Sequence, residues 1–176
     1  MSRLYWIKLR AAGRIAIMAR PRAGEWLELE VNDWKKLGVE IVVSLLEPEE
    51  ISELALPQEA ELCRSSGIDF ISFPIRDRGV PASEREVLQL ADSLIASVKA
   101  GRSIAIHCRA GIGRSSLIAA CALICCGIGA EVALERIKDA RGLSVPDTDE
   151  QRDWLSGFAR TYRDEVSRSR TKSHDG

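Results

Sequence analysis

Two short apolar segments, residues 40–46 and 103–107, limit the fold most strongly, because they lack the polar–apolar alternation of a half-exposed strand. Such runs are typical of strands that are covered on both faces, as in a parallel sheet between two layers of helices. Residues 68–75 predict a further strand, and the segments between the strands have helical spacing. Strands that alternate with helices predict an α/β fold with a central, mainly parallel sheet flanked by helices.

Apolar residues at helical spacing, together with helix-terminal signals, define the remaining elements. Ser83 and Glu86 form a capping box at the start of one helix, and Asp147 is the expected N-cap of the last one. We predict helices over 25–37, 48–63, 83–100, 115–126, 130–141 and 148–166. Residues 4–9 and 14–18 predict a hairpin or two separate strands.

Composition indicates one domain. The chain has 176 residues, 45% of them hydrophobic, which is enough for one sizeable core. We expect a single domain over 1–166 and a disordered polar tail over 167–176. The longest nearly apolar run, 117–128, is too short for a bilayer span of about 20 residues. Five irregularly spaced cysteines do not suggest a disulfide framework, so a soluble, cytoplasmic protein is expected.

A glycine-containing turn directly follows the strand at 103–107 and leads into an apolar helix. Its sequence is His107-Cys108-Arg109-Ala110-Gly111-Ile112-Gly113-Arg114-Ser115-Ser116. Gly111 and Gly113 permit backbone angles closed to other residues, so successive N–H groups can point at one anion. The N-terminal end of the helix adds positive potential at the same place. The turn is therefore a candidate anion-binding loop.

Three side chains give this loop its chemistry. Cys108 lies where a helix N-terminus and an arginine favour the thiolate, which is the nucleophilic form. Arg114, across the loop, offers a planar guanidinium that can bind two phosphate oxygens at once. Ser115 can donate a hydrogen bond to the Cys108 sulfur and so ease its departure from a covalent intermediate.

The stretch resembles the phosphate-binding loop of the protein tyrosine phosphatase superfamily, His-Cys-x-x-Gly-x-x-Arg-Ser/Thr, and fills each fixed position. The resemblance implies the phosphatase fold, hydrolysis of phosphate monoesters through a phosphocysteine on Cys108, and no cofactor. It also implies that His107 is a buried residue that supports the loop. The phosphate-binding positions would be Arg109, Ala110, Gly111, Ile112 and Gly113.

The superfamily uses an upstream Asp as general acid, and Asp77 is our candidate. It lies in Pro74-Ile75-Arg76-Asp77-Arg78-Gly79-Val80-Pro81, after one predicted strand and before a helix. This segment is similar to the acid loop of small dual-specificity phosphatases related to the cyclin-dependent-kinase-associated phosphatase. Its flanking arginines, Arg76 and Arg78, would lower the pKa of Asp77 or help to collect anionic substrates. A turn residue without a catalytic role is the alternative, and Asp69 is the nearest rival.

Two further positions are left with alternatives. Related phosphatases often have a glutamine where Gln151 stands, so Gln151 would contact substrate or position the hydrolytic water, or else face solvent in the first helical turn. A metal site at His107 is not expected, because the other histidine, His174, lies in the tail and no cysteine pair has zinc spacing. Cys121, Cys125 and Cys126 fall in an apolar helix and are expected to pack as small hydrophobic residues.

The function predicted from the sequence is that of a monomeric protein phosphatase that acts on phosphotyrosine, with some phosphoserine or phosphothreonine. The rivals are a lipid phosphatase or RNA 5′-phosphatase of the same superfamily, and a catalytically inactive phosphate-binding module. Lys and Arg number 25 against 26 Asp and Glu, which provides no general attraction to nucleic acid or membrane. Ile112, where lipid-directed relatives often have Lys, argues against phosphoinositides, whereas Arg109 leaves them possible.

Overall fold

The computed structural model describes residues 3–172, with residues 169–172 as backbone only. Its centre is a five-stranded sheet in the order β1-β2-β5-β3-β4. The strands are β1 (Tyr5–Trp6), β2 (Arg14–Ala19), β3 (Ile41–Ser44), β4 (Asp69–Ser72) and β5 (Ser103–Cys108). β1 runs antiparallel to β2, and the other neighbouring pairs are parallel. The predicted mainly parallel sheet is confirmed, and the first two segments form an antiparallel pair.

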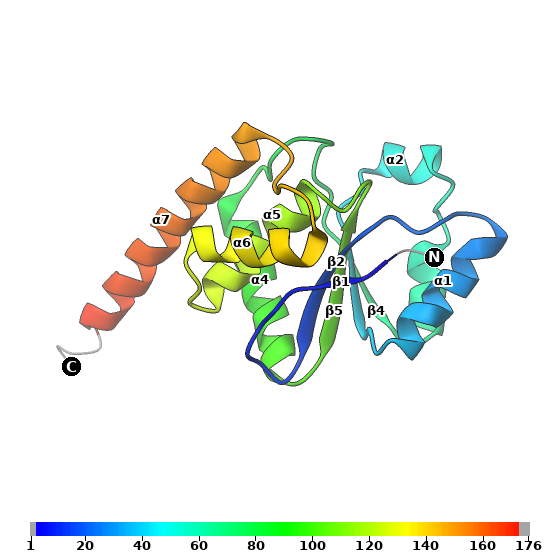
Figure 1. Cartoon of the computed structure of the whole chain (residues 1–176), viewed down its shortest axis with the longest axis horizontal. Helices are drawn as coiled ribbons and strands as arrows, with labels where there is room; N and C mark the ends of the chain where they lie inside the picture. Colours follow the sequence, from blue (N-terminus) through cyan, green and yellow to red (C-terminus); the bar gives the residue numbers. More distant parts are fainter. Residues whose placement is uncertain (1–2, 173–176) are drawn as a thin grey trace.

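Two layers of helices enclose the sheet, which Figure 1 shows almost edge-on. The helices are α1 (Glu25–Lys36), α2 (Pro48–Glu53), α3 (Glu59–Ser65), α4 (Glu84–Lys99), α5 (Arg114–Cys125), α6 (Ala130–Arg141) and α7 (Asp149–Lys172). α1, α2 and α3 lie on one side, and α4 to α7 lie on the other (Figure 1). One hydrophobic core forms on each side.

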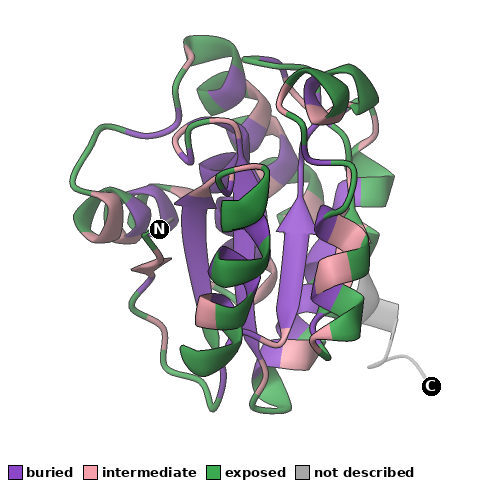
Figure 2. Ribbon diagram, turned by 90° about the vertical axis from the view of Figure 1, so that its right-hand side faces the viewer, coloured by how far each residue is buried: buried purple, intermediate pink, exposed green. Residues whose placement is uncertain are grey.

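The most apolar elements occupy the centre of the molecule. Each residue of β3 and β5 is buried, and these strands appear buried along their length in Figure 2. α5 is buried from Arg114 to Ile124, because it packs against the sheet and against α4, α6 and α7. A helix that is enclosed in this way needs no polar face, which explains its nearly continuous apolar sequence.

The single helix predicted over 48–63 is wrong, since the chain forms α2 and α3 with a break between them. Ala55 has a left-handed φ of 53°, which an α-helix does not tolerate. Pro57 disfavours the helical conformation at Leu56, the residue before it. The break places the short α2 beside the carboxyl end of β3.

The ends of α7 also differ from the prediction. Thr148, rather than Asp147, caps the helix, because its Oγ1 accepts the N–H of Gln151 at 3.2 Å. The helix continues to Lys172, through part of the segment predicted as a tail. Residues 173–176 lie outside the described residues.

The carboxyl ends of the parallel strands meet at one edge of the sheet. Cys108, the last residue of β5, lies opposite Ala19 of β2, and Ser44 of β3 lies opposite His107. The segments that follow β3, β4 and β5 therefore emerge side by side. Ligands of open α/β sheets bind at this edge.

Candidate active site

A small pocket of about 260 Å³ opens at this edge of the sheet. It is lined by Asp77, Arg78, Cys108, Arg109, Ala110, Ile112, Gly113, Arg114, Asp147 and Gln151. The fold thus brings the candidate acid, from the loop after β4, to the candidate nucleophile and cation, which lie at the two ends of the turn between β5 and α5. A larger groove of about 500 Å³ lies between α4 and α7, but its lining does not combine a cysteine with an arginine.

The two glycines serve the loop in different ways. Gly111 has a φ of 66°, and a Cβ there would lie 2.5 Å from the carbonyl oxygen of Met18 at the end of β2. Gly113 has an ordinary φ of −84°, so the expectation that it needs an unusual φ is wrong. Position 113 needs a glycine because there is no room for a side chain: a Cβ would lie 2.9 Å from both Asp147 Cβ and Gln151 Oε1.

Arg114 begins α5 and is 2% exposed. Its guanidinium donates to both carboxylate oxygens of Glu50, at 2.6 and 2.9 Å, and to the carbonyl of Ile75 at 2.9 Å. Nη2 also donates to Asp77 Oδ1 at 2.8 Å. Burial alone would lower the pKa of Arg114, but the bonds to Glu50 and the nearby negative groups outweigh it and raise that pKa. The cation is fixed in place at the bottom of the pocket.

Glu50 is the carboxylate that holds Arg114. Burial alone would raise the pKa of Glu50, but the hydrogen bond from Arg114, the backbone N–H of Glu47 and the charges of Arg114 and Arg109 outweigh it and lower that pKa. Glu50 belongs to a capping box at the start of α2, where it accepts the N–H of Glu47 at 3.0 Å. Glu50 is not among the site residues predicted from the sequence. The Glu47-Pro48-Glu49-Glu50 pattern is typical of a helix start, and this signal could have identified Glu50 as a residue with a fixed side chain.

Cys108 and Ser115 face each other across the start of α5. Cys108 is 3% exposed, and its sulfur lies 3.5 Å from Ser115 Oγ, which is within hydrogen-bond range for sulfur. The sequence placed these residues at a strand end and a helix start, and the structure brings them into contact. A hydroxyl in this position can stabilise the sulfur as a thiolate.

Asp77 lies over the pocket from the loop after β4. Its side chain is 48% exposed, and its N–H donates to Glu47 Oε2 at 3.1 Å. The next residue, Arg78, has a left-handed φ of 56° and forms an ion pair with Asp147 at 3.3 Å. Asp69 is the first residue of β4 and so lies at the amino ends of the parallel strands, away from the pocket at their carboxyl ends. It pairs with Arg102 at 2.6 Å, so it is no longer a rival to Asp77 as the candidate acid.

Gln151 is fully buried between two loops. One is the candidate acid loop, residues 74–81, and the other is the candidate phosphate loop, residues 108–113. Its Nε2 donates to the carbonyl of Gly79 at 2.9 Å, and its Oε1 accepts the N–H of Asp147 at 3.1 Å. The alternative that Gln151 faces solvent is therefore wrong. The residue links the segment that contains Asp77 to the start of α7.

Arg109 and His107 have contrasting surroundings. Arg109 is exposed at the mouth of the pocket, where it pairs with Glu53 at 2.9 Å. His107 is buried, and its Nε2 lies 2.9 Å from Glu59 Oε1, although the approach does not align for a hydrogen bond. The structure therefore places His107 in a buried position beside α3.

The remaining cysteines lie away from this pocket. Burial raises the pKa of Cys125 to about 12, and burial with the nearby Glu59 raises the pKa of Cys63 to about 12. Cys121 is fully buried, and burial also raises its pKa. Within residues 3–172, no group of three His, Cys, Asp or Glu side chains could hold a metal ion.

A parallel α/β sheet whose central strand delivers a cysteine to an anion-binding loop, with an arginine at the start of the next helix, defines a cysteine-dependent phosphatase. The family model described as "PTP-SAK: Swiss Army Knife protein, DSP-PTPase phosphatase domain" matches residues 2–171. The chain belongs to this family, and it is a dual-specificity-type protein phosphatase domain.

Individual proteins resemble this chain in sequence or in fold. Human cyclin-dependent kinase inhibitor 3 is 28% identical over 134 residues, which cover 75% of this chain and 63% of the human protein. A crystal structure of kinase-associated phosphatase with its catalytic cysteine replaced by serine matches with a TM-score of 0.82 and 24% identity, over 94% of this chain and 96% of that one. Tk-PTP in its active form matches with a TM-score of 0.71 and 26% identity, over 84% and 92%. This chain thus spans less than two thirds of the human relative's length.

Proposed function

We propose that this domain removes phosphate from phosphoproteins, phosphotyrosine first, through a covalent phosphocysteine on Cys108. The observation that carries the proposal is that Cys108, Arg114 and Asp77 line one pocket at the carboxyl edge of the sheet. We assign the whole catalytic function to a single domain over residues 1–166. The assignment of roles follows from the position of each group.

In the first step, the Cys108 thiolate attacks phosphorus and forms the S–P bond while the bond to the leaving oxygen breaks. The leaving oxygen takes the electron pair of that bond and the proton of the Asp77 carboxylic acid. Arg114 and the N–H groups of the phosphate loop stabilise the charge on the three remaining oxygens. Arg114 Nη2, now bonded to Asp77 Oδ1, is the donor that would turn to the phosphate.

In the second step, Asp77 as a carboxylate takes a proton from water, and the water oxygen attacks phosphorus. The S–P bond breaks, its electron pair returns to Cys108, and the Ser115 hydroxyl donates to the departing sulfur at the contact that is 3.5 Å here. Inorganic phosphate then leaves. We assign Gln151 the role of holding the loop that contains Asp77 against the start of α7, since its Nε2 donates to the carbonyl of Gly79 and its Oε1 accepts the N–H of Asp147.

The dimensions of the site support a phosphoprotein as substrate. A volume of about 260 Å³ is below the range of about 300–1,000 Å³ for whole small-molecule sites, which supports a substrate that extends beyond the pocket. The human relative, cyclin-dependent kinase inhibitor 3, is by its name connected with a protein kinase. We propose that the domain acts as a cytoplasmic monomer, without nucleic acid or membrane. Within residues 3–172, no helix combines the length and apolar character of a bilayer span.

Hydrolysis of p-nitrophenyl phosphate tests the residue roles. We expect Cys108→Ser to abolish turnover, and we expect Asp77→Asn to lower kcat about 100-fold and to remove the loss of activity at high pH. Asp69→Asn is the matched control and should leave turnover unchanged, because Asp69 lies at the amino ends of the strands, away from the pocket. Unchanged activity in Cys108→Ser would overturn the mechanism. Phosphopeptides, phosphoinositides and 5′-phosphorylated RNA, assayed side by side, test the substrate class.

A further inference from the structure

Arg141, the last residue of α6, reaches the outer side of the phosphate loop. Its Nε donates to the carbonyl of Gly111 at 2.9 Å, and its Nη2 lies 3.3 Å from the carbonyl of Ala110. The sequence analysis did not select this residue, because nothing in its local pattern separates it from any basic residue in the last turn of a helix. Its bonds go to the loop rather than to the carbonyls of its own helix.

These two carbonyls determine where two N–H groups of the loop point. A peptide unit is planar and trans, so its C=O and the following N–H point in opposite directions. When Arg141 binds the carbonyls of Ala110 and Gly111 on the outer side, the N–H groups of Gly111 and Ile112 are turned away from it. Ala110 and Ile112 line the pocket on the inner side. The orientation of both peptide units is the one that an anion in the pocket requires.

The guanidinium of Arg141 is itself held from the N-terminal strand. Its Cζ lies 4.3 Å from the centroid of the Tyr5 ring, and Tyr5 belongs to β1 at the edge of the sheet. The Cζ of Arg3 lies 5.3 Å from the same ring. A guanidinium over an aromatic face is attracted by the ring quadrupole and loses freedom to move. Tyr5 thus limits the positions that Arg141 can adopt.

We infer that Arg141 is a positioning residue for phosphate binding, which holds two peptide units of the loop with their N–H groups toward the anion, and that Tyr5 holds Arg141. The inference rests on the proposed role of residues 108–114 as the phosphate site. It makes the N-terminal strand part of the binding machinery, although no residue of that strand lines the pocket. Loss of Arg141 should weaken anion binding more than it weakens the fold.

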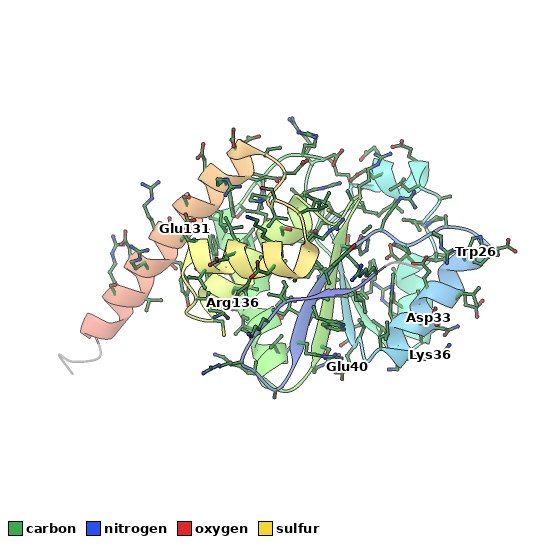
Figure 3. The ribbon with its side chains drawn as sticks, viewed as in Figure 1. Trp26, Asp33, Lys36, Glu40, Glu131 and Arg136 are labelled. Atoms are coloured by element: carbon green, nitrogen blue, oxygen red, sulfur yellow. The ribbon has the colours of Figure 1, made fainter. Side chains whose placement is uncertain are left out.

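The chain offers a matched control on the same helix. Arg136, labelled in Figure 3, also ties α6 to the N-terminal segment, because its Nη1 donates to the carbonyl of Lys8 at 3.3 Å. This hydrogen bond goes to the N-terminal segment and not to the phosphate loop. A variant of Arg136 therefore removes an equivalent anchor between α6 and the N-terminal segment and leaves the loop carbonyls bonded.

The test is the Kd of the full chain for inorganic phosphate, measured by calorimetry and so without turnover. Arg141→Met should raise this Kd about tenfold, the loss expected for a charge-assisted hydrogen bond, with Arg141→Lys between it and the parent. Tyr5→Leu should raise it about threefold. Arg136→Met should leave it unchanged.

Alkylation of Cys108 gives a second measurement. In Arg141→Met, the rate of alkylation by anionic iodoacetate should fall relative to the rate by neutral iodoacetamide. A merely structural role of Arg141 would not change this ratio of rates.

Each result decides the inference. A Kd for Arg141→Met within about twofold of the parent, or an equal effect of Arg136→Met, would overturn it. If Arg141→Met fails to fold, Arg141→Lys and Tyr5→Leu decide by the same measurements, and parent-like values in both would overturn it. A parent chain that binds no phosphate would refute the proposed site itself. Phosphate binding by the parent with an unaffected Arg141→Met refutes the inference alone.

Discussion

Arg114 is oriented before any phosphate arrives, because three residues from two separate segments of the chain, α2 and the loop after β4, hold its guanidinium. Glu50 of α2 binds it in bidentate fashion, the carbonyl of Ile75 accepts from Nη1 at 2.9 Å, and Asp77 binds Nη2. A group fixed in this way needs little reorganisation when charge develops on the phosphate oxygens. Of these contacts, only the one to Asp77 is at the partly exposed side of the pocket.

Glu50→Gln is predicted to destabilise the fold and to slow turnover. Replacing the carboxylate by an amide removes the charge from a buried ion pair, so we expect the free energy of unfolding at pH 7 to fall by about 2 kcal/mol. The kcat should fall as well, because Arg114 loses the group that orients it. Urea unfolding followed by circular dichroism and p-nitrophenyl phosphate hydrolysis measure the two effects.

The same variant should alter the pH dependence of stability. The pKa of Glu50 is below its ordinary value of 4.5 in the folded chain, so its stabilising effect is complete above about pH 4.5 and is lost as the pH falls further. Glu50→Gln should therefore lose less stability than the parent on acidification below pH 4.5. Glu53→Gln, on the same helix and 63% exposed, is the control and should behave like the parent. Parallel pH profiles for the parent and Glu50→Gln would contradict the assignment.

Site residues differ in how visible they are in the sequence. Cys108 and Arg114 are visible because one loop fixes their spacing, and local geometry then places both at one anion. The roles of Glu50 and Arg141 do not follow from local spacing, because Glu50 reaches Arg114 from α2 and Arg141 reaches the loop carbonyls from α6. Gln151 falls between these cases: its position at a helix start was evident, whereas its burial depends on the approach of the acid loop.

At the scale of elements, the start of α7 connects a helix cap to the site. Thr148 Oγ1 accepts the N–H of Gln151, and the Gln151 side chain in turn bonds to Gly79 of the acid loop. We predict that Thr148→Ala lowers the free energy of unfolding by about 1 kcal/mol, the usual cost of losing an N-cap. Chemical denaturation measures this change.

Thr161→Ala is the control for the cap, because it makes the same change on the same helix. Thr161 Oγ1 donates to the carbonyl of Gly157 at 3.3 Å within an exposed turn, so its loss should change stability by less than about 0.5 kcal/mol. Equal losses in the two variants would show that the cap is not the source of the effect.

Elements were predictable where one physical signal dominated. β3 and β5 are buried at each position, and α6 has the predicted bounds of residues 130–141, since Gly129 and Gly142 mark its ends. The prediction failed between α2 and α3, where the apolar residues of 48–63 suit a helix but Ala55 and Pro57 interrupt it. The order of the strands was beyond the sequence pattern, because long-range pairing decides it.

At the scale of the whole molecule, β5 is the element on which both cores and the site depend. It lies between β2 and β3, is covered on both faces, and ends on Cys108. One core contains Ile104 and Ile106 of β5, and the other contains Ala105. β1, by contrast, is a two-residue strand at the edge of the sheet. The resistance of these strands to opening should differ accordingly.

Native-state hydrogen exchange tests this hierarchy. The amides of Ile104 to His107 should exchange only by global unfolding, with one common free energy that falls with urea at the slope of the complete transition. The amides of Tyr5 and Trp6 should exchange at a lower free energy. Phosphate at about 100 times its Kd should raise the protection of β5 by about 2.7 kcal/mol, because the anion binds the folded chain alone. Equal protection of β1 and β5 would contradict this prediction, because it would mean that the sheet opens as one unit. In that case Tyr5 of β1 could not separate from Arg141 while the rest of the sheet stays closed.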